Sequence, residues 1–245
     1  MAETIERNMG MIDSDIEEYY NAIRTNIQFF GNDMRTILMT SVTDSEGKST
    51  VSINLATSFA ELGKKTLLID ADTRNSVLLN RFNINKKVVG LTNYLSGISK
   101  LEEVLYNTNQ PNLTILPAGK VPPNPTVLLQ NNYFDEMMRK LRKEYDYIIV
   151  DTPPIGMVID AAIIGLRCDG AVVVVESGKV GKRAVMKARE SLEQAGCSFL
   201  GVILNKVGKK GANYGGYGGY GGYGGYGGYG SYGSYGQYGK KKNKK

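Results

Sequence analysis

The chain has 245 residues, of which 42% are hydrophobic and 22% are charged, and it contains two cysteines and no histidine. Without histidine, catalysis by a Ser–His or Cys–His pair and any metal site that needs a histidine ligand are excluded. The formal net charge of +6 arises at the C-terminal end, because residues 209–245 hold seven of the 30 basic residues and no acid, which leaves 23 basic against 24 acidic residues elsewhere; a folded, basic nucleic-acid-binding surface is therefore not predicted.

Short apolar or β-branched runs alternate with helical patterns along most of the chain. A helix is predicted near Ile16–Phe30, before the first strand. The candidate strands are Thr36–Thr40, Thr66–Asp70, Leu113–Leu116, Tyr147–Asp151, Ala171–Glu176 and Leu200–Asn205. Further helices are predicted between them at Ser49–Leu62, Pro125–Lys143 and Val180–Ala195. Continuous apolar strands separated by helices predict an α/β fold, a doubly wound and mostly parallel sheet with helices on both faces.

The composition divides the chain into three parts. Residues 1–34 hold an N-terminal segment with the first helix, and residues 35–208 hold the α/β domain. Residues 209–245 form a basic tail of glycine and tyrosine, which has too little surface to bury to offset the entropy of ordering, so disorder is predicted. Tyrosine recurs at every third position of this tail, at Tyr214, Tyr217, Tyr220, Tyr223, Tyr226, Tyr229, Tyr232, Tyr235 and Tyr238.

A polar loop follows the first strand and leads into a helix that starts with Gly47-Lys48-Ser49-Thr50. This is the context of a phosphate-binding P-loop, in which backbone N–H groups surround the phosphates, Lys48 contacts the β/γ oxygens and the Ser49 hydroxyl binds Mg²⁺. The match is incomplete, because Val42 stands where the first glycine is usual. An ordinary strand–turn–helix with a surface lysine is the alternative interpretation.

Acidic residues end two later strands. Asp70 and Asp72 close one strand just before Arg74, and Asp151 closes another before a Pro-Pro pair. Ligands bind at the carboxyl ends of strands in doubly wound sheets, and Mg²⁺ prefers oxygen ligands. Three carboxylates beside a P-loop therefore predict a site for Mg²⁺ and ATP. In the alternative interpretation, each aspartate is the N-cap of a helix.

These motifs resemble those of the bacterial tyrosine autokinases of capsular and exopolysaccharide biosynthesis, above all the separate cytoplasmic kinases of Gram-positive bacteria of the streptococcal and lactic-acid type. The resemblance runs from Glu18 to the tail. Related ATPases of the MinD and ParA type, which position cell-division or plasmid machinery, share the fold. They carry an additional lysine near the start of the P-loop, where this chain has Val42-Thr43-Asp44.

The resemblance implies a role for each motif residue. Lys48 holds the β/γ phosphates and Thr50 the α-phosphate, while Asn205 contacts the adenine or, alternatively, only caps its strand. The full set of nucleotide-binding residues is expected to be Thr43, Asp44, Ser45, Glu46, Gly47, Lys48, Ser49, Thr50, Arg74 and Asn205.

For catalysis, the resemblance implies that Ser49, Asp72 and Asp151 bind Mg²⁺. Asp70 is the expected base or orienting group for the tyrosine hydroxyl, with a place in the metal shell as the alternative. Together with Lys48, these three aspartates form the expected catalytic set. Phosphoryl transfer depends mainly on positioning and charge neutralisation, so a weak base suffices.

Two departures from the family pattern affect these expectations. Many members have Pro-Gly where this chain has Asp44-Ser45, which adds a carboxylate near the phosphates. Many also have a Glu-x-x-Arg-x-x-Arg motif on the first helix, the expected oligomerisation helix within residues 1–34. Here the aligned residues are Glu18, Asn21 and Arg24, so the middle arginine is missing and a closed ring is expected to be weak.

The implied function is a Mg-ATP-dependent tyrosine kinase that phosphorylates its own tail tyrosines between protomers and regulates polysaccharide synthesis and export. The implied partners are a transmembrane activator, a phosphotyrosine phosphatase and further copies of the chain, with no nucleic acid. The chain has no apolar run near ~18 residues and no signal peptide, and its two cysteines are consistent with reduced thiols. We therefore expect a cytoplasmic protein held at the inner face of the plasma membrane by a partner.

Two other functions remain open on the sequence. The first is a positioning or scaffold ATPase of the MinD and ParA type, which transfers phosphate to water. The second treats the Tyr/Gly-rich basic tail as a phase-separating or RNA-binding segment. The tyrosine tail and the absence of the extra P-loop lysine favour the kinase.

Overall fold

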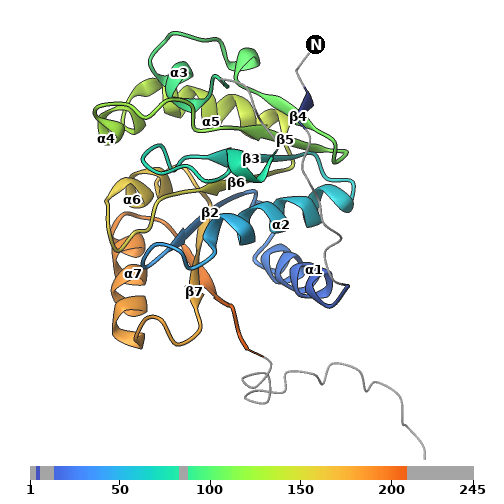
Figure 1. Ribbon diagram of the computed structural model, residues 1–245, viewed down its shortest axis with the longest axis vertical. Helices are drawn as coiled ribbons and strands as arrows, with labels where there is room; N and C mark the ends of the chain where they lie inside the picture. The colour runs from blue at the N-terminus through green and yellow to red at the C-terminus, as the bar shows by residue number, and fades with distance from the viewer. Residues whose placement is uncertain (1–3, 6–13, 83–87, 209–245) are drawn as a thin grey trace, which may run out of the picture. The chain divides into compact units, whose positions relative to one another are not determined.

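The computed structural model describes residues 4–5, 14–82 and 88–208, and residues 1–207 form a structural unit separate from residues 208–245. Within the described residues, a sheet of eight strands runs in the order β1-β4-β5-β3-β6-β2-β7-β8 (Figure 1). Neighbouring strands are parallel except β4 and β5, which are antiparallel. The predicted doubly wound, mostly parallel α/β fold is confirmed.

All six predicted strands are present within one or two residues of their expected ends. They are β2 (Thr36–Ser41), β3 (Thr66–Asp70), β5 (Leu113–Leu116), β6 (Tyr147–Asp151), β7 (Gly170–Glu176) and β8 (Phe199–Asn205). Two short strands, β1 (Thr4–Ile5) and β4 (Tyr106–Thr108), were not predicted, because two or three residues are too few for a recognisable pattern. The central strands β2 and β3 are buried along their whole length, which explains why their sequences are apolar without alternation.

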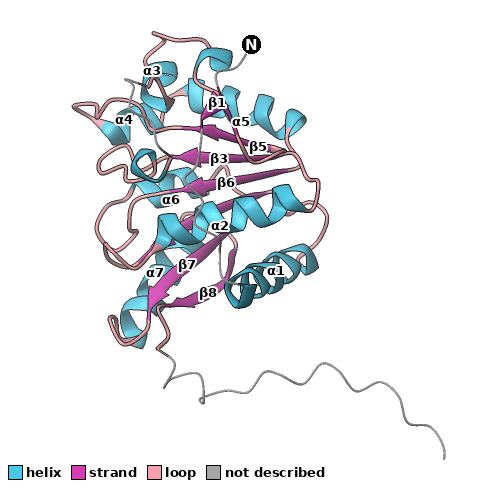
Figure 2. Cartoon of the chain, turned by 45° about the vertical axis from the view of Figure 1, so that its right-hand side comes forward, coloured by secondary structure: helices cyan, strands magenta, loops and turns pink. Residues whose placement is uncertain are grey.

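One face of the sheet is covered by α1 (Ser14–Phe29) and α2 (Lys48–Glu61), which lie side by side in Figure 2. Leu55 and Phe59 of α2 are fully buried and pack in one core with Met39 and Ile149 of the sheet. α2 is buried along most of its length, because α1 covers it from outside. The helix that carries Lys48 and Ser49 is therefore fixed by the core.

The other face is covered by a second core, which includes Phe134, Met137 and Leu192. The helices of this layer are α3 (Leu91–Leu95), α4 (Pro125–Leu129), α5 (Asn132–Glu144), α6 (Asp160–Gly165) and α7 (Lys182–Gln194). Two 3₁₀ turns, Leu79–Arg81 and Leu101–Glu103, lie in the connections. With helices on both faces, the carboxyl ends of the parallel strands are left as the edge at which a ligand can bind.

The helix predicted over Pro125–Lys143 is divided into α4 and α5. The reason is local: Asn131 adopts an extended conformation and its side-chain oxygen accepts a hydrogen bond from the Phe134 amide (3.2 Å), which starts a new helix. Its side-chain NH₂ donates to the Leu95 carbonyl (2.9 Å). Through these two hydrogen bonds, Asn131 links the start of α5 to the end of α3.

Two of the three motif residues of α1, Asn21 and Arg24, bind α2 of the same chain. The Arg24 guanidinium donates to the carbonyl (2.7 Å) and the hydroxyl (2.8 Å) of Ser58 on α2, and the Ser58 hydroxyl contacts Asn21 (3.0 Å). Tyr19 and Phe29 of α1 remain exposed. Among the described residues, no helix has the length and apolarity needed to cross a membrane. The tail tyrosines lie outside the described residues.

Candidate active site

The loop between β2 and α2 has the backbone conformation that a phosphate site needs. Gly47, the residue before α2, has φ 89°, a conformation that residues with a side chain rarely adopt, and a Cβ there would lie 2.1 Å from the side-chain nitrogen of Asn205, which would have to move. The first amides of α2, at Lys48–Thr50, have no acceptor within the helix and carry the positive end of its dipole. The predicted P-loop is therefore a strand–loop–helix whose amides are available to an anion.

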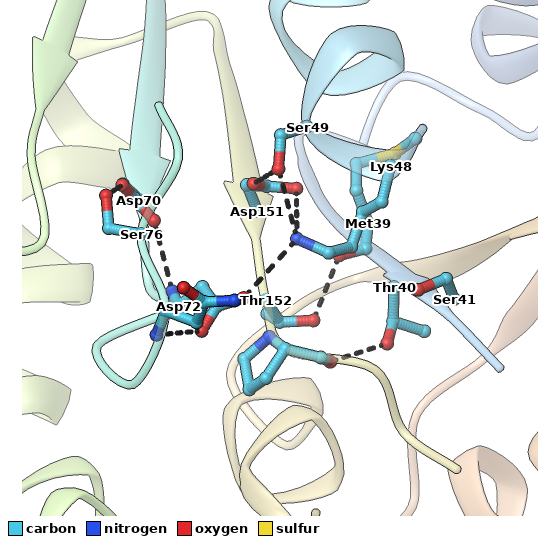
Figure 3. A network of polar contacts seen from close by, with 12 residues as sticks. Met39, Thr40, Ser41, Lys48, Ser49, Asp70, Asp72, Ser76, Asp151 and Thr152 are labelled. Carbon is cyan, nitrogen blue, oxygen red and sulfur yellow. Dashed lines mark hydrogen bonds and ion pairs between the residues drawn. The ribbon is translucent and has the colours of Figure 1, made fainter. Parts of the chain in front are cut away.

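Asp151 at the end of β6 is the centre of a buried polar cluster (Figure 3). It accepts hydrogen bonds from Lys48 (3.0 Å), Ser49 (2.6 Å) and Ser52 (2.8 Å), and its exposed fraction is 1%. The Lys48 ammonium also lies 3.9 Å from a carboxylate oxygen of Asp72. The structure thus brings together the lysine, the hydroxyl and two of the three carboxylates that the sequence predicted.

Asp70 lies beside Asp151 in the sheet but has different surroundings. It is fully buried and accepts hydrogen bonds from the Ser76 hydroxyl and the Asp72 amide. Burial, reinforced by the nearby charge of Asp151, raises the pKa of Asp70 to about 7, although Ser76 and Lys48 act in the opposite direction. Asp70 is thus a carboxyl group that takes up a proton near neutral pH.

A cavity of about 460 Å³ opens between the loop and the ends of the strands. Asp72 lines it, whereas Asp70 is not among the described lining residues. The lining residues are Ser41, Asp44, Ser45, Glu46, Gly47, Lys48, Ser49, Thr50, Asp72, Arg74, Asn75, Val77, Arg81, Pro153, Pro154, Met157, Val158 and Lys206. The cavity thus has a polar side at the loop and an apolar side at the β6–α6 connection.

Arg74, predicted to bind the nucleotide, is held by a residue that the sequence did not single out. Its guanidinium contacts the two carboxylate oxygens of Asp160 (2.7 and 3.2 Å), and the hydrogen bond to Asp160 is the main cause of its raised pKa. Asp160 is buried and also accepts a hydrogen bond from Thr126 (2.8 Å). Its place at the first turn of a six-residue helix gave no recognisable signal.

Glu46 and Asn205 support the loop in this structure. The Glu46 carboxylate accepts from the amide (2.5 Å) and hydroxyl (2.9 Å) of Thr43 and from the Glu176 amide (3.0 Å). The Asn205 NH₂ group donates to the Glu46 carbonyl (2.9 Å), and Asn205 is not among the described cavity-lining residues. Its contact with the adenine stays a prediction.

The donor set suits a magnesium nucleotide. The described residues contain no group of three or more histidine, cysteine, aspartate or glutamate side chains placed to hold a metal ion. Mg²⁺ needs no such cage, because it is held by one or two carboxylates together with phosphate oxygens and water. The oxygens of Ser49, Asp151 and Asp72 around the Lys48 ammonium meet this requirement.

Comparisons with known proteins agree with this geometry. Residues 34–191 match the family described as AAA domain. The Tyrosine-protein kinase CpsD of Streptococcus agalactiae is 56% identical over 199 residues, which cover 81% of this chain and 87% of that protein. Because nearly the whole of that kinase aligns with this chain, the likeness extends well beyond the P-loop.

Two solved structures share the fold. The kinase domain of the Escherichia coli tyrosine kinase ETK has a TM-score of 0.75 and 33% identity, covering 78% of this chain and 75% of that one. The septum site-determining protein MinD from Pyrococcus horikoshii, complexed with Mg-ADP, has a TM-score of 0.60 and 31% identity, covering 71% of each chain. The match to the kinase domain is the better of the two. The resemblance stated above is confirmed: this chain belongs to the bacterial tyrosine kinases of capsular and exopolysaccharide biosynthesis, in their separate-chain Gram-positive type, and is a nucleotide-binding protein-tyrosine kinase.

Proposed function

We propose that this kinase transfers the γ-phosphoryl group of Mg-ATP to the tyrosines of its own tail, from one protomer to another. The carrying observation is the cluster at Asp151, which sets the Lys48 ammonium and the Ser49 hydroxyl around one buried carboxylate at the amide-rich end of α2. A triphosphate bound at these amides would meet a cation and the oxygen ligands of a metal at the same point.

In this proposal, Ser49, Asp151 and Asp72 hold Mg²⁺, which neutralises the charge of the phosphates when bound. In this structure the Lys48 ammonium is paired with Asp151, so it has to leave this carboxylate in order to reach the β/γ oxygens. Thr50 and the loop amides from Asp44 to Ser49 hold the remaining phosphates, and Arg74 also lines the cavity, whereas the Thr43 amide is already bound to Glu46. These residues position the phosphate chain for in-line attack.

The acceptor tyrosine attacks the γ-phosphorus through its phenolic oxygen. An oxygen–phosphorus bond forms, the bond to the β-phosphate oxygen breaks, ADP leaves, and the phenolic proton passes to Asp70. The pKa of Asp70, about 7, suits a group that gains and loses a proton at neutral pH. The Ser76 hydroxyl is hydrogen-bonded to one oxygen of Asp70, and Asp72 lines the cavity where Asp70 does not. The proposal therefore requires the segment from Asp72 to Ser76 to move when the tyrosine enters, so that the phenol can reach Asp70.

The acceptors are the nine tyrosines from Tyr214 to Tyr238. The composition predicts an unordered tail, and an unordered glycine-rich segment of ~30 residues has an r.m.s. reach of roughly 30 Å. A substrate tethered in this way has an effective concentration on the order of mM. The kinase therefore needs only weak recognition of the residues around each tyrosine, which agrees with nine acceptors whose neighbours in the sequence are nearly identical.

The test is to incubate the purified chain with Mg-ATP and to map phosphate by mass spectrometry. Lys48→Met removes the cluster's cation, and Lys143→Met removes an exposed lysine of α5 as the matched control. We expect phosphate on several tail tyrosines in the wild type and in Lys143→Met, and none in Lys48→Met. ATP consumption without phosphotyrosine would instead favour a positioning ATPase of the MinD type, which the fold also accommodates.

Transfer between protomers has a separate test. Full-length Lys48→Met serves as the acceptor, and an active chain with all nine tail tyrosines changed to phenylalanine serves as the donor. Phosphate on the Lys48→Met tail shows transfer between chains. An unmodified acceptor, with a donor that still phosphorylates an added tyrosine peptide, restricts the reaction to one chain.

We further infer partners from the family relationship: a transmembrane activator, a cognate phosphotyrosine phosphatase and other copies of the chain. The activator would hold this cytoplasmic kinase at the inner face of the membrane, close to polysaccharide synthesis and export. Because Asn21 and Arg24 are bound to Ser58 within the chain, self-association through α1 would use its exposed residues, such as Tyr19. Changing Tyr19 to serine and following the oligomeric state in the presence of an activator fragment tests this arrangement.

A further inference from the structure

Two lysines that follow the neighbouring strands β7 and β8 bind carbonyl groups of the phosphate loop. Lys206, just after β8, donates to the Ser45 carbonyl (2.8 Å). Lys179, just after β7, donates to the Asp44 carbonyl. Both ammonium groups are paired with the same carboxylate, that of Glu176 at the end of β7, at 3.0 Å for Lys206 and 3.7 Å for Lys179. One carboxylate thus fixes two cations, and each cation fixes one loop peptide.

The loop needs this support at Ser45. Its φ of 59° lies in the left-handed region, which costs a residue with a side chain roughly 1 kcal/mol compared with the usual conformations. Lys206 itself has φ 54°, so the chain turns sharply after β8 and the lysine side chain reaches back to the loop. The hydrogen bond between Lys206 and Ser45 therefore joins two residues in uncommon conformations.

Holding a carbonyl group also orients an amide. In a trans peptide, the C=O of one residue and the N–H of the next point in opposite directions. Lys179 at the Asp44 carbonyl therefore directs the Ser45 amide away from Lys179, and Lys206 at the Ser45 carbonyl does the same for the Glu46 amide. Because Ser45 and Glu46 line the cavity, the direction in which these two amides point affects how they can interact with an anion bound there.

We propose that Glu176, Lys179 and Lys206 form a positioning clamp that sets the nucleotide affinity of the phosphate loop by orienting the Ser45 and Glu46 amides. The proposal rests on the proposed placement of the triphosphate in this loop. None of the three is among the residues that the sequence assigned to the site. Glu176 contributes no direct contact to the nucleotide and acts only through the two lysines.

A competing explanation is that Lys206, which also lines the cavity, binds the phosphates directly. The two explanations predict opposite results for Glu176→Gln. If the carboxylate anchors the clamp, its loss frees both lysines from the loop carbonyls and weakens nucleotide binding. If Lys206 is a direct ligand, losing its ion pair with Glu176 releases the ammonium to the phosphates and strengthens binding.

The experiment measures the dissociation constant of a fluorescent ADP analogue with Mg²⁺, and it needs no phosphoryl transfer. We expect Lys206→Met and Glu176→Gln each to raise the dissociation constant about tenfold, as for the loss of one charged hydrogen bond. Lys206→Arg should restore most of the affinity. Lys187→Met, which changes an exposed lysine on α7, is the matched control and should bind like the wild type.

Stability and turnover separate the clamp from a merely structural role. The clamp side chains are partly exposed, at 48% for Lys206, and exposed ion pairs contribute little to folding, so the melting temperatures should stay near that of the wild type. At saturating ATP, the rate of phosphorylation should recover. Unchanged or tighter binding in Glu176→Gln overturns the proposal. A wild-type chain that binds the analogue but does not phosphorylate its tail contradicts the proposed function. The clamp can still be tested in that case, because the dissociation constants do not depend on phosphoryl transfer.

Discussion

Asp70 and Asp151 are paired residues on the neighbouring parallel strands β3 and β6, yet only Asp151 contacts Lys48 at hydrogen-bond distance. Asp151 is surrounded by three donors, whereas Asp70 is buried with the Ser76 hydroxyl and one backbone amide. Two identical side chains at the same level of the sheet thus have different chemistry. One is equipped to hold cations, and the other is equipped to take up a proton.

The first prediction concerns Asp70→Asn. The pKa of Asp70 is about 7 in the folded chain and 3.8 as the ordinary value, so between these values the native state binds more protons than the unfolded state. Its contribution to stability is present below pH 3.8 and is lost as the pH rises toward 7, by up to about 4 kcal/mol in total. In urea titrations without nucleotide and Mg²⁺, Asp70→Asn should lose this decline and be more stable than the wild type above pH 7. Parallel curves for the two proteins would show that the pKa of Asp70 is not raised.

The second prediction concerns Ser52, whose hydroxyl contacts an oxygen of Asp151 (2.8 Å) and the Lys48 carbonyl (3.0 Å) in a buried position. Ser52→Ala leaves a buried carboxylate with one donor fewer, which should cost about 1 to 3 kcal/mol of stability and also reduce kinase activity. Ser191→Ala is the control, because the Ser191 hydroxyl donates to the Lys187 carbonyl at an exposed position of α7. Equal, small effects of both substitutions in urea unfolding would contradict the role of Ser52 at Asp151.

The third prediction is an asymmetry in the pair of Arg74 and Asp160. The Asp160 side chain is 1% exposed and that of Arg74 is 38% exposed. Arg74→Met leaves a buried charge without its partner and should destabilise the fold by about 3 kcal/mol, whereas Asp160→Ala leaves an arginine that water can reach and should cost less. The free energy of unfolding without nucleotide measures both.

The control for this asymmetry is the pair of Arg189 and Glu193 on α7, in which both side chains are about half exposed. Glu193→Ala should change the stability by less than about 1 kcal/mol. If Asp160→Ala proves more damaging than Arg74→Met, the burial of Asp160 is not the dominant effect.

The fourth prediction concerns the two thiols. Burial raises the pKa of Cys197 to about 11 and raises that of Cys168 well above its ordinary value. At pH 8 the thiolate fraction is then small, so alkylation of folded Cys197 by iodoacetamide should be on the order of 100-fold slower than in the urea-unfolded chain. Mass spectrometry of the two cysteines over time measures this. Rapid labelling of Cys197 in the folded protein would contradict the raised pKa.

The sequence predicted the elements whose patterns are long and local. β2, β3 and β6 are continuous apolar runs, and Gly47-Lys48-Ser49 marks the turn between a strand and a helix, so the strand ends and the P-loop could be located without coordinates. The parallel sheet then implied that Asp72 and Asp151 approach Lys48, which the structure bears out. The sequence also predicted Asp70 beside them, but it did not predict that Asp70 is buried and is not among the described cavity-lining residues.

Other parts of the site depend on contacts between distant segments. Asp160 binds Arg74, which lies 86 residues away in the sequence, and Lys206 binds Ser45, which lies 161 residues away. At such separations in the sequence, the spacing of residues does not predict a contact. Ser52 is different, because it lies one helical turn after Lys48 and the i, i+4 spacing could have placed it at the same face. Glu46 was assigned to the nucleotide because it lies in the loop, yet its carboxylate faces Thr43 and the Glu176 amide.

The register of β3 and β6 has a consequence for how the site opens. Asp70 and Asp151 end the most central strands, where the backbone continues in hydrogen bonds such as that from the Ala71 amide to the Asp151 carbonyl (2.8 Å). Their amides should exchange with deuterium only when the whole chain unfolds. Lys206 follows β8, an edge strand of the sheet, where local fraying is enough for exchange. Asp70 and Asp151 are thus expected to stay in place, while the phosphate loop is joined through Lys206 to the edge of the sheet, where local opening is expected first.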